Sequence, residues 1–446
     1  MKTQIIVNNK AQLVNPDLRT KKYIQKVFTI ENPKFEEAEK YGRYTGDIDE
    51  YIYLYEDTES GIIFPRGWTR NALKLLQDKG IEPEIVDNRR ALEPIEFKFR
   101  GMLRDYQQKA VQDVIKRGFG VLGAPTGSGK TIMALKIIAV RKQPTLILVH
   151  SRELLNQWRD QIRKFLDVTP GLIGDGKYNI GPVTVAVVNT AKKHLDELPG
   201  YFGHIIVDEC HRTPSTMFTE VVTAFDAYFM LGLSATTYRR DKLTKLIYFT
   251  LGDKVHEVDQ EELQENGDIL APKVIKRETD FYYPYADDYQ EMLTALTEDK
   301  DRNQQIVNDV VSESTRGVAL IVSDRVAHCA ELAKMLDHRG ICTELLTGQT
   351  KRAERERIVQ EVQAGKIQAL VSTVQLLGEG FDCENLSTLF LTTPVRFKGR
   401  LMQVIGRILR PADDKSPKVY DYVDSLVGVL RSQAKSREYA LAEIES

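Results

Sequence analysis

The 446-residue sequence has only four cysteines, and no two of them form a CxxC pair. A disulfide framework and a cysteine-based zinc site are therefore both disfavoured. No apolar run approaches the roughly 18 residues that a membrane-spanning helix needs. The first residues, MKTQIIVNNK, lack the continuous apolar segment of a secretory signal. We therefore expect a cytoplasmic protein that has no membrane partner.

The chain also has almost no net charge, because its 62 Lys and Arg residues nearly balance its 64 Asp and Glu residues. Any nucleic-acid binding must then come from local patches. In the first thirty residues six basic residues oppose one acidic residue, Asp17, with Tyr23 and Phe28 between them. Two interpretations are open: a surface that binds nucleic acid, with rings stacking on bases, or a charged edge strand that prevents aggregation.

What is present is an alternation of short apolar runs with helical patterns from Leu103 onward, which is typical of parallel α/β sheets. We predict a first series of strands at 120–122, 145–150, 183–188, 204–209 and 229–236. A second series is predicted at 318–323, 342–348, 368–373, 388–394 and 418–424. The two series therefore predict two successive doubly wound α/β domains.

Residues 1–97 lack the alternation of apolar strands and helices seen in the rest of the chain. We predict that they form a small α+β accessory domain that engages DNA. Tyr51, Tyr53 and Tyr55 alternate along a strand and share one face, where core packing is favoured over base stacking. The segment 266–288 has Gly and Pro and no clear periodicity, so we interpret it as a connector. The predicted domains are 1–97, 98–267 and 268–446.

The strongest local signal is APTGSGKT, between a predicted strand and a predicted helix. It fits the phosphate-binding loop pattern except that Ala124 replaces the first Gly. Gly127 and Gly129 let backbone N–H groups approach phosphate oxygens, Lys130 can reach the β- and γ-phosphates, and Thr131 can hold Mg²⁺. The predicted nucleotide-binding residues are Ala124, Pro125, Thr126, Gly127, Ser128, Gly129, Lys130 and Thr131.

A second motif, DECH, ends a predicted strand at residues 208–211. Asp208 can hold the Mg²⁺, and Glu209 can orient or deprotonate the attacking water, which are the tasks that the loop leaves unfilled. A strand that merely happens to end in Asp-Glu is the alternative, and the loop upstream disfavours it. By themselves the two motifs predict a nucleoside triphosphatase.

The surrounding motifs resemble those of superfamily 2 helicases, with nine elements in the family's order over residues 100 to 425. LRDYQ (103–107) resembles the adenine-reading element, APTGSGKT motif I, VHSREL (149–154) motif Ia, VNTAKK (188–193) motif Ib, DECH motif II and LSAT (233–236) motif III. IVSDR (321–325), STVQLLGEGFD (372–382) and QVIGRILR (403–410) resemble motifs IV, V and VI. DECH, RDYQ and TTYRRD are similar to the XPB-like and UvsW-like branch, and most of all to its phage branch-migration helicases.

The resemblance implies tandem RecA-like domains that use ATP and Mg²⁺. Arg104 and Gln107 would then contact the adenine, for which the Gln107 amide is both donor and acceptor. Gly380 and Asp382 would contact the nucleotide from motif V, Asp382 through the ribose. The remaining implied roles are catalysis beside the γ-phosphate by Gln403, with Arg407 and Arg410 as arginine fingers, and coupling to the track by His211, Ser234, Ala235 and Thr236.

For Arg407 and Arg410, one helical turn apart, a solvated basic helix face is the alternative, and for Ser234 it is a turn or cap. A motor that moves along any sequence holds mainly the phosphodiester backbone. By resemblance, the residues that contact the strand are Ser151, Arg152, Thr190, Ser323, Arg325 and Thr373. For each of these six, a polar side chain that simply ends a strand is the alternative. Arg239 and Arg240 form a basic cluster on a predicted loop after LSAT, which can contact DNA.

The family implies an ATP-dependent DNA helicase or translocase that moves 3′ to 5′ and remodels forks and Holliday junctions in recombination, repair or replication. Its partners would be single-stranded and branched duplex DNA, in the cytoplasm of a bacterium or a phage-infected host. Three alternatives are open: an RNA helicase, a duplex-tracking motor subunit of a restriction or repair assembly, and a non-catalytic ATP clamp. The presence of Glu209 and both arginines disfavours the clamp.

Overall fold

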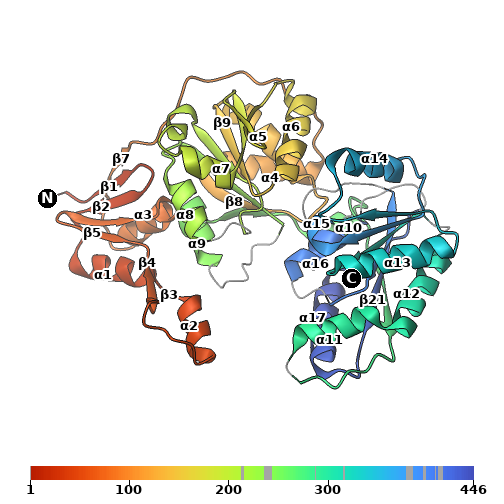
Figure 1. Ribbon diagram of the computed structural model, residues 1–446. Helices are drawn as coiled ribbons and strands as arrows, with labels where there is room; N and C mark the ends of the chain where they lie inside the picture. Colours follow the sequence, from red (N-terminus) through yellow and green to blue (C-terminus); the bar gives the residue numbers. More distant parts are fainter. Residues whose placement is uncertain are drawn as a thin grey trace. The chain divides into compact units, whose positions relative to one another are not determined.

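The computed structural model describes residues 2–211, 215–235, 244–286, 288–314, 317–377, 385–394, 398–406, 408–409 and 415–445. For residues 215, 216, 218, 352, 377, 398–400, 403, 443 and 445 only the backbone is described. The chain divides into two compact units, one of residues 1–124 and 129–258 and the other of residues 125–128 and 259–446 (Figure 1). The expected domain limits at residues 97 and 267 stay predictions.

The N-terminal part of the first unit forms a sheet of its own in the order β5-β6-β2-β1-β7. Neighbours in it are antiparallel, except that β7 runs parallel to β1. Helices α1 and α3 contribute Ile24, Ala72 and Leu76 to the core under this sheet, so the predicted α+β arrangement is present. The elements of this part are β1 (Gln4–Val7), β2 (Ala11–Val14), α1 (Leu18–Val27), β3 (Thr29–Glu31), α2 (Pro33–Lys40), β4 (Tyr51–Tyr53), β5 (Glu56–Thr58), β6 (Gly61–Phe64), η1 (Arg66–Trp68), α3 (Thr69–Gln77) and β7 (Glu84–Asp87).

The expected core packing of the alternating tyrosines is wrong for two of the three. Tyr51 and Tyr53 are 38% and 60% exposed. The reason is that their strand, β4, pairs with β3 in a small antiparallel sheet of its own and not with the main sheet. Only Tyr55, just after β4, packs against the N-terminal core.

The turn at residues 64–68 connects this N-terminal part to the rest of the first unit through close backbone contacts and hydrogen bonds. Arg66 is 2% exposed, and its Nη1 donates to the carbonyl oxygens of Asn8 and Ala227, at 3.1 Å each. At Gly67 an added Cβ would lie 2.5 Å from the backbone nitrogen of Gly252. The two backbones therefore touch here, and only glycine fits.

The larger sheet of the first unit has the order β11-β10-β12-β9-β13-β14-β8-β15, and its pairs are parallel except for β10 with β11. Helices cover both of its faces (Figure 1). All five predicted strands are present, as β8 (Phe119–Gly123), β9 (Thr145–Val149), β12 (Val183–Val187), β13 (His204–Val207) and β14 (Phe229–Ser234). The other elements are β10 (Gly171–Gly174), β11 (Lys177–Asn179), β15 (Lys254–Glu257), α4 (Asp105–Ile115), α5 (Lys130–Arg141), α6 (Arg152–Leu166), α7 (Val188–Ala191), η2 (Lys192–His194), η3 (Leu198–Tyr201), α8 (Ser215–Thr223) and α9 (Thr244–Leu251).

The second unit has a parallel sheet in the order β16-β21-β20-β17-β19-β18. The second series of predicted strands is also present, as β17 (Val318–Ser323), β18 (Thr343–Leu346), β19 (Ala369–Thr373), β20 (Leu386–Leu391) and β21 (Lys418–Val423). The connector interpretation is wrong for β16 (Lys273–Glu278), an edge strand parallel to β21. The helices are α10 (Gln260–Glu265), α11 (Tyr289–Glu298), α12 (Lys300–Glu313), α13 (Val326–His338), α14 (Arg352–Gln363), α15 (Val374–Leu377), α16 (Lys398–Ile405) and α17 (Gly428–Glu445).

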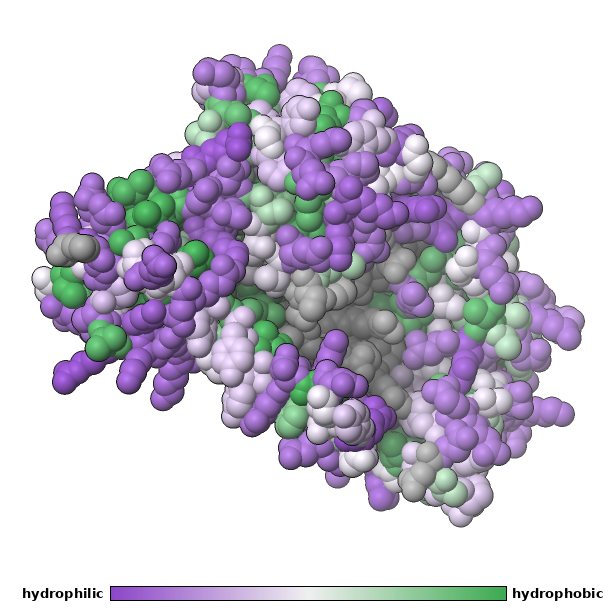
Figure 2. All heavy atoms as spheres, turned by 60° about the vertical axis from the view of Figure 1, so that its left-hand side comes forward, coloured by the Kyte–Doolittle hydropathy of each residue, from purple (hydrophilic) through white to green (hydrophobic). Residues whose placement is uncertain are grey.

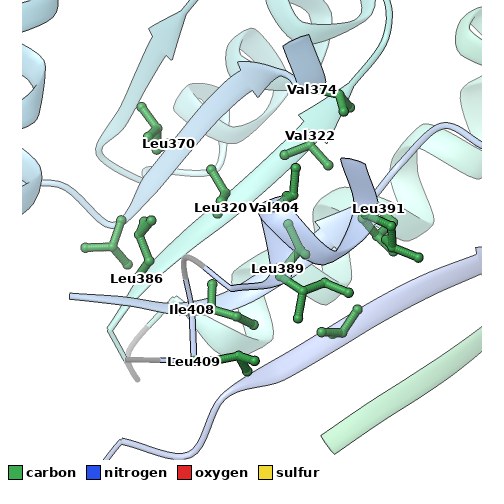
Figure 3. Close-up of a cluster of buried hydrophobic side chains, with 14 of the residues drawn as sticks. Leu320, Val322, Leu370, Val374, Leu386, Leu389, Leu391, Val404, Ile408 and Leu409 are labelled. Carbon is green, nitrogen blue, oxygen red and sulfur yellow. The ribbon is translucent and has the colours of Figure 1, made fainter. Parts of the chain in front are cut away.

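Alternate residues of a strand in this sheet enter two different cores. Leu320 and Val322 of β17 join Leu389 of β20 and Val404 of α16 in one core (Figure 3). The intervening Ile321 packs with α12 and α13 on the opposite face. Burial on both faces explains why these strands are continuously apolar. Over the described residues, no helix is long and apolar enough to cross a membrane.

Candidate nucleotide site and nucleic-acid track

The order of strands in the first unit gathers the predicted nucleotide motifs at one edge. Strands β13, β14 and β8 are consecutive and parallel, so their carboxyl ends meet there. The loop that begins at Ala124 follows β8, Asp208 follows β13, and β14 ends at Ser234. Backbone hydrogen bonds tie these ends together, since the Ala124 N–H donates to the Ser234 carbonyl at 2.9 Å and the Cys210 N–H to the Leu233 carbonyl at 3.0 Å.

The phosphate-binding loop owes its shape to glycine. Gly129 precedes α5 with φ of 82°, a left-handed conformation that other residues adopt only at a cost. A Cβ at this position would also lie 2.5 Å from Nε2 of Gln107. Gly129 therefore serves both the turn and a close approach of the loop to the predicted adenine-reading residue.

Lys130 begins α5 and lies between the loop and the acidic pair. Its Nζ donates to the Ala124 carbonyl at 3.1 Å and lies 3.6 Å from Oε1 of Glu209. A triphosphate in the loop would give this ammonium a stronger partner than a neutral carbonyl. Thr131 follows directly in the first turn of α5, as the motif requires.

Both oxygens of the Asp208 carboxylate accept hydrogen bonds. Oδ1 accepts from the backbone N–H of Glu209 at 2.9 Å, and Oδ2 accepts from the indole Nε1 of Trp158 at 2.8 Å. Burial and the neighbouring charge of Glu209 raise the pKa of Asp208 to about 6, although the bond from Trp158 and the charge of Lys130 act in the opposite direction. Glu209 itself has φ of 46°, an unusual conformation for a residue other than glycine and one that is common at functional sites.

The residues present fit a Mg²⁺ ion that arrives with a nucleotide. Asp208 and Thr131 supply a carboxylate and a hydroxyl oxygen, the hard ligands that Mg²⁺ prefers. Only one or two such protein ligands are usual when phosphate oxygens complete the shell. Asp208 is 8% exposed, so its charge acts in a setting that water screens weakly.

Motifs II and III are joined by side chains. Nδ1 of His211 lies 2.9 Å from the hydroxyl of Ser234 and 3.4 Å from Oε2 of Glu209. The structure thus brings together three of the predicted catalytic and coupling residues. Ala235 follows Ser234 directly, and Thr236 lies outside the described residues.

The predicted adenine-reading residues lie at the start of α4. The Arg104 backbone N–H donates to Oε1 of Gln107 at 3.0 Å, and Gln107 Nε2 donates to the Tyr106 hydroxyl at 3.2 Å. The Gln107 side chain is buried, and it abuts the phosphate-binding loop at Gly129. Its amide is therefore held in a fixed orientation next to the loop.

In the first unit the predicted track residues follow two paired strands. Val149 and Val187 are register partners at the carboxyl ends of β9 and β12. Ser151 follows β9 and caps α6, where its hydroxyl accepts from the Leu154 N–H at 3.3 Å. Thr190 is in α7, directly after β12. Next to Ser151, Arg152 pairs with Asp175 at 3.5 Å, and its side chain is mostly exposed.

In the second unit Ser323 and Thr373 are register partners at the ends of β17 and β19. Ser323 is fully buried, and its hydroxyl lies 3.0 Å from Nδ1 of His328 and accepts from the Arg325 N–H at 3.1 Å. This hydroxyl is therefore engaged inside the domain. The guanidinium of Arg325 is half-buried and bonds to Gln290. The role of both residues in holding a strand stays a prediction.

Several predicted residues lie outside the described part of the chain. They are Thr236, Arg239, Arg240, Gly380, Asp382, Arg407 and Arg410. Gln403 is in α16, where only its backbone is described. Their expected roles stay predictions that rest on the motifs.

Helix α1 bears on one of the two interpretations of the basic N-terminus, the charged edge strand, and the nucleic-acid surface stays a prediction. Four of the six basic residues, Arg19, Lys21, Lys22 and Lys26, are in this helix and not in an edge strand. Lys21 pairs with Asp57 at 2.9 Å. The other three share an exposed face with Leu18 and Tyr23, which are 77% and 50% exposed. Phe28 is fully buried and so cannot stack on a base.

Sequence reasoning missed one residue of this site, Trp158. Its ring is buried in α6, on the same face as Leu155, Ile162 and Leu166. A buried indole, however, has an N–H that needs an acceptor. That requirement was a signal that a polar partner had to lie nearby, although the sequence could not identify Asp208 as the partner.

The fold and the site define a class of protein. Two parallel α/β domains in tandem, with a phosphate-binding loop, an acidic pair and a linked serine on the first, are typical of ATP-driven enzymes that act on nucleic acid. Residues 100–239 match the family described as "Type III restriction enzyme, res subunit", and residues 302–412 match "Helicase conserved C-terminal domain".

These two matches and the relatives that follow show an ATP-driven helicase and support the superfamily 2 assignment that the motifs predict, with similarity to its XPB-like members. Helicase D10 of Escherichia phage T5 is 28% identical over 366 residues, 79% of this chain and 78% of that protein. DNA 3′-5′ translocase XPB2 of Sulfurisphaera tokodaii is 26% identical over 381 residues, 75% of this chain and 85% of that one.

Among solved structures, an HsdR subunit fragment of a type I restriction enzyme from Vibrio vulnificus aligns with a TM-score of 0.58 and 19% identity. The alignment covers 98% of this chain and 82% of the fragment. This likeness concerns the fold, which is the two tandem RecA-like domains expected from the sequence.

Proposed function

We propose that this helicase acts on DNA, moves 3′ to 5′ and remodels branched DNA such as forks and Holliday junctions in recombination, repair or replication. The observation that carries the proposal is the chain of contacts from Lys130 through Glu209 and His211 to Ser234. It links the phosphate-binding loop to motif III inside one domain. A chain of contacts of this kind suits an ATPase whose turnover responds to a bound strand.

In the proposed reaction, Lys130 holds the β- and γ-phosphates and Glu209 orients and deprotonates the attacking water. Asp208 and Thr131 would hold Mg²⁺, which would neutralise the charge that develops on the phosphates. From the second domain, Gln403 would lie beside the γ-phosphate and Arg407 and Arg410 would stabilise its charge. Because loop and fingers belong to different domains, ATP binding and hydrolysis would control the relation between those domains and so drive movement.

The strand would be held by its phosphates. Ser151, Arg152 and Thr190 follow neighbouring strand ends of the first domain, and Thr373 is the last residue of a strand of the second. Hydroxyls, helix N-termini and scattered cations are the usual ligands of a sequence-independent track. The name of XPB2, a DNA 3′-5′ translocase, supports DNA as the polymer and 3′ to 5′ as the direction. Similarity to a phage protein supports the proposal that this helicase is located in the cytoplasm of a bacterium or a phage-infected host.

For the N-terminal part we propose a second DNA contact through the exposed face of α1. Arg19, Lys22 and Lys26 would take phosphates, and Tyr23 offers a ring for stacking. Hydrophilic side chains cover most of the face that the N-terminal part presents in the space-filling view (Figure 2). Such a site, added to the track, would favour a branched substrate over a single strand because two contacts can be made at once.

The first test is ATP hydrolysis by the purified chain with no polynucleotide, single-stranded DNA, duplex DNA, a four-way junction and RNA. Several salt concentrations are needed, because phosphate contacts weaken steeply with salt. We expect the strongest stimulation by the junction. Stimulation by RNA alone would keep the motor and overturn the DNA assignment, in favour of an RNA helicase.

A second candidate is a motor subunit of a larger restriction or repair assembly that tracks duplex without separating strands. The family matched by residues 100–239 and the HsdR fragment favour it. The two candidates differ in one measurement, the displacement of a labelled strand from a fork by the isolated chain. Displacement supports the helicase, whereas duplex-stimulated hydrolysis with no displacement supports the tracking subunit.

A further inference from the structure

We propose that Trp158 is a positioning residue for ATP hydrolysis, which fixes the Asp208 carboxylate and links it to the helix that carries Ser151 and Arg152. The inference deepens the proposed function and rests on it. Its starting point is the bond of 2.8 Å from the indole Nε1 to Oδ2 of Asp208. The indole is a donor only, so the direction of this bond does not depend on any choice of protonation.

Each oxygen of the Asp208 carboxylate accepts a hydrogen bond, which fixes the orientation of the group. With Oδ2 bonded to Trp158 and Oδ1 bonded to the Glu209 N–H, rotation of the group would break one bond or both. Each oxygen keeps further lone pairs that can face a cation. A carboxylate held in this way needs no reorganisation when a metal and a nucleotide arrive, which is the condition for effective electrostatic stabilisation.

The two partners depend on each other because both are buried. Trp158 is 2% exposed, and without Asp208 its N–H would be a buried donor with no acceptor. Asp208, in turn, is a buried carboxylate whose charged form the indole stabilises. The alternative is that Asp208 merely satisfies the tryptophan and that the bond has no part in metal binding. These two possibilities make different predictions for a variant that keeps the ring and loses the N–H.

Helix α6 connects the bond to the proposed track. It begins at Arg152 and is capped by Ser151, and Trp158 lies roughly two turns further along the same helix. Leu155, Ile162 and Leu166 are buried on the same face, so the helix is packed along its length. A packed helix moves as one body, and a shift of its first turn when a strand binds would therefore reach the Asp208 carboxylate.

The first experiment is Trp158→Phe, which removes the donor and keeps an aromatic ring. Binding of a fluorescent ATP analogue is followed while Mg²⁺ is titrated, and binding is also measured without metal. We expect the Mg²⁺ midpoint to rise by roughly 10- to 100-fold, the usual cost of losing a partner that orients a ligand. Nucleotide binding without metal should stay within about twofold. An unchanged Mg²⁺ midpoint in a folded variant overturns the inference.

The matched control is Trp68→Phe, because the sequence has only two tryptophans. Trp68 packs against Phe28 and Phe64 in the N-terminal part, far along the chain from the loop. The same chemical change there should leave the Mg²⁺ midpoint at its original value. An equal rise in both variants would indicate a general loss of stability and would also overturn the inference.

The control variant also gives a test that leaves Trp158 intact, in case Trp158→Phe does not fold. In Trp68→Phe the only indole is Trp158, so its fluorescence reports on the bond to Asp208. We expect the emission to change when Mg²⁺ is added with a nonhydrolysable nucleotide, and again when single-stranded DNA is added alone. No change at DNA concentrations that saturate binding by anisotropy would remove the link through α6. If the unaltered chain neither hydrolyses ATP nor binds DNA, the proposed function fails instead, which is a distinguishable result.

Discussion

Nδ1 of His211 lies 2.9 Å from the hydroxyl of Ser234, and this contact joins the acidic motif at the end of β13 to the end of β14. Both groups are largely buried, so the contact is screened little by water. On the other side, His211 lies 3.4 Å from Glu209, the proposed base. A change in the position of Ser234 would therefore shift His211 and, through it, Glu209, which orients the attacking water.

We predict that Ser234→Ala separates ATP hydrolysis from strand displacement. The variant loses the hydroxyl that His211 contacts and keeps the acidic pair, so basal ATPase should stay within about threefold. Stimulation by DNA and displacement of a strand should both fall by about tenfold or more, since the loss of one buried hydrogen bond is worth on the order of 1 to 3 kcal/mol. The control is Ser436→Ala, which removes an exposed hydroxyl of α17. Full displacement by Ser234→Ala would contradict the proposed coupling.

A second prediction separates binding from turnover at the ATP site. Lys130→Ala removes the ammonium next to Ala124 and Glu209, and we expect turnover to fall by about 10²-fold or more with weaker ATP binding. Arg407→Ala should reduce turnover by roughly 10³-fold or more, as for a lost arginine finger, while ATP binding stays nearly intact. Steady-state ATPase and equilibrium binding of a fluorescent ATP analogue measure the two effects. Undiminished hydrolysis by either purified variant would refute the site assignment.

Much of this fold could be predicted from periodicity, because strands buried on both faces are continuous apolar runs. TLILV and VALIVS are of this kind, and both lie inside their sheets. The missed strands are edge strands or short ones. Lys273–Glu278 pairs on one side only and carries four charged residues, so its sequence resembles a loop.

The site was predictable where one short motif contains the chemistry, as for Gly129 and Lys130. It was not predictable where the partner comes from a distant segment. Trp158 and Asp208 are 50 residues apart and meet only because β9 and β13 are neighbours in the sheet. The burial of Ser323 was unforeseen for a different reason. Its partner His328 is close in sequence, but their contact depends on how α13 turns back onto the strand end.

A third prediction concerns the junction between the N-terminal part and the first α/β domain. Gly67→Ala would place a Cβ 2.5 Å from Gly252 N and 2.6 Å from the carbonyl oxygen of Phe249. Backbone cannot yield as a flexible side chain can, so we expect a loss of about 1 to 3 kcal/mol in unfolding free energy. Gly200→Ala is the control, because an added Cβ there meets nothing within 4 Å. Urea denaturation compares the two, and equal midpoints would contradict the close approach.

The fourth prediction is a loss of stability in mild acid that depends on His328. Its Nε2 lies 2.8 Å from Oδ1 of Asn303 and its Nδ1 lies 3.0 Å from the Ser323 hydroxyl, a setting that suits the neutral ring. Burial, with the charge of Arg302 in addition, lowers the pKa of His328 to about 3. Below about pH 6.5 the unfolded state takes up a proton that the folded state does not, so stability falls as the pH drops from 6.5 toward 3.

At pH 5 this one residue should cost about 2 kcal/mol relative to pH 7.5. His328→Gln cannot bind the proton, so its stability should fall less over the same interval, even though it starts lower at pH 7.5. Urea denaturation at the two pH values gives the comparison. The same pH dependence in both proteins would show that His328 is not responsible.

The last prediction tests the exposed face of α1. Lys22→Ala combined with Lys26→Ala removes two cations from that face, and the opposite face with Thr20 and Ile24 keeps the helix packed. If both lysines contact phosphates, affinity for a four-way junction should fall, and the slope of log affinity against log salt should flatten by roughly 2. The matched control is Lys34→Ala with Lys40→Ala, two exposed lysines of the neighbouring helix α2. Basal ATPase should be unchanged in both, and an unaltered salt slope for the α1 variant would remove this helix from the DNA-binding surface.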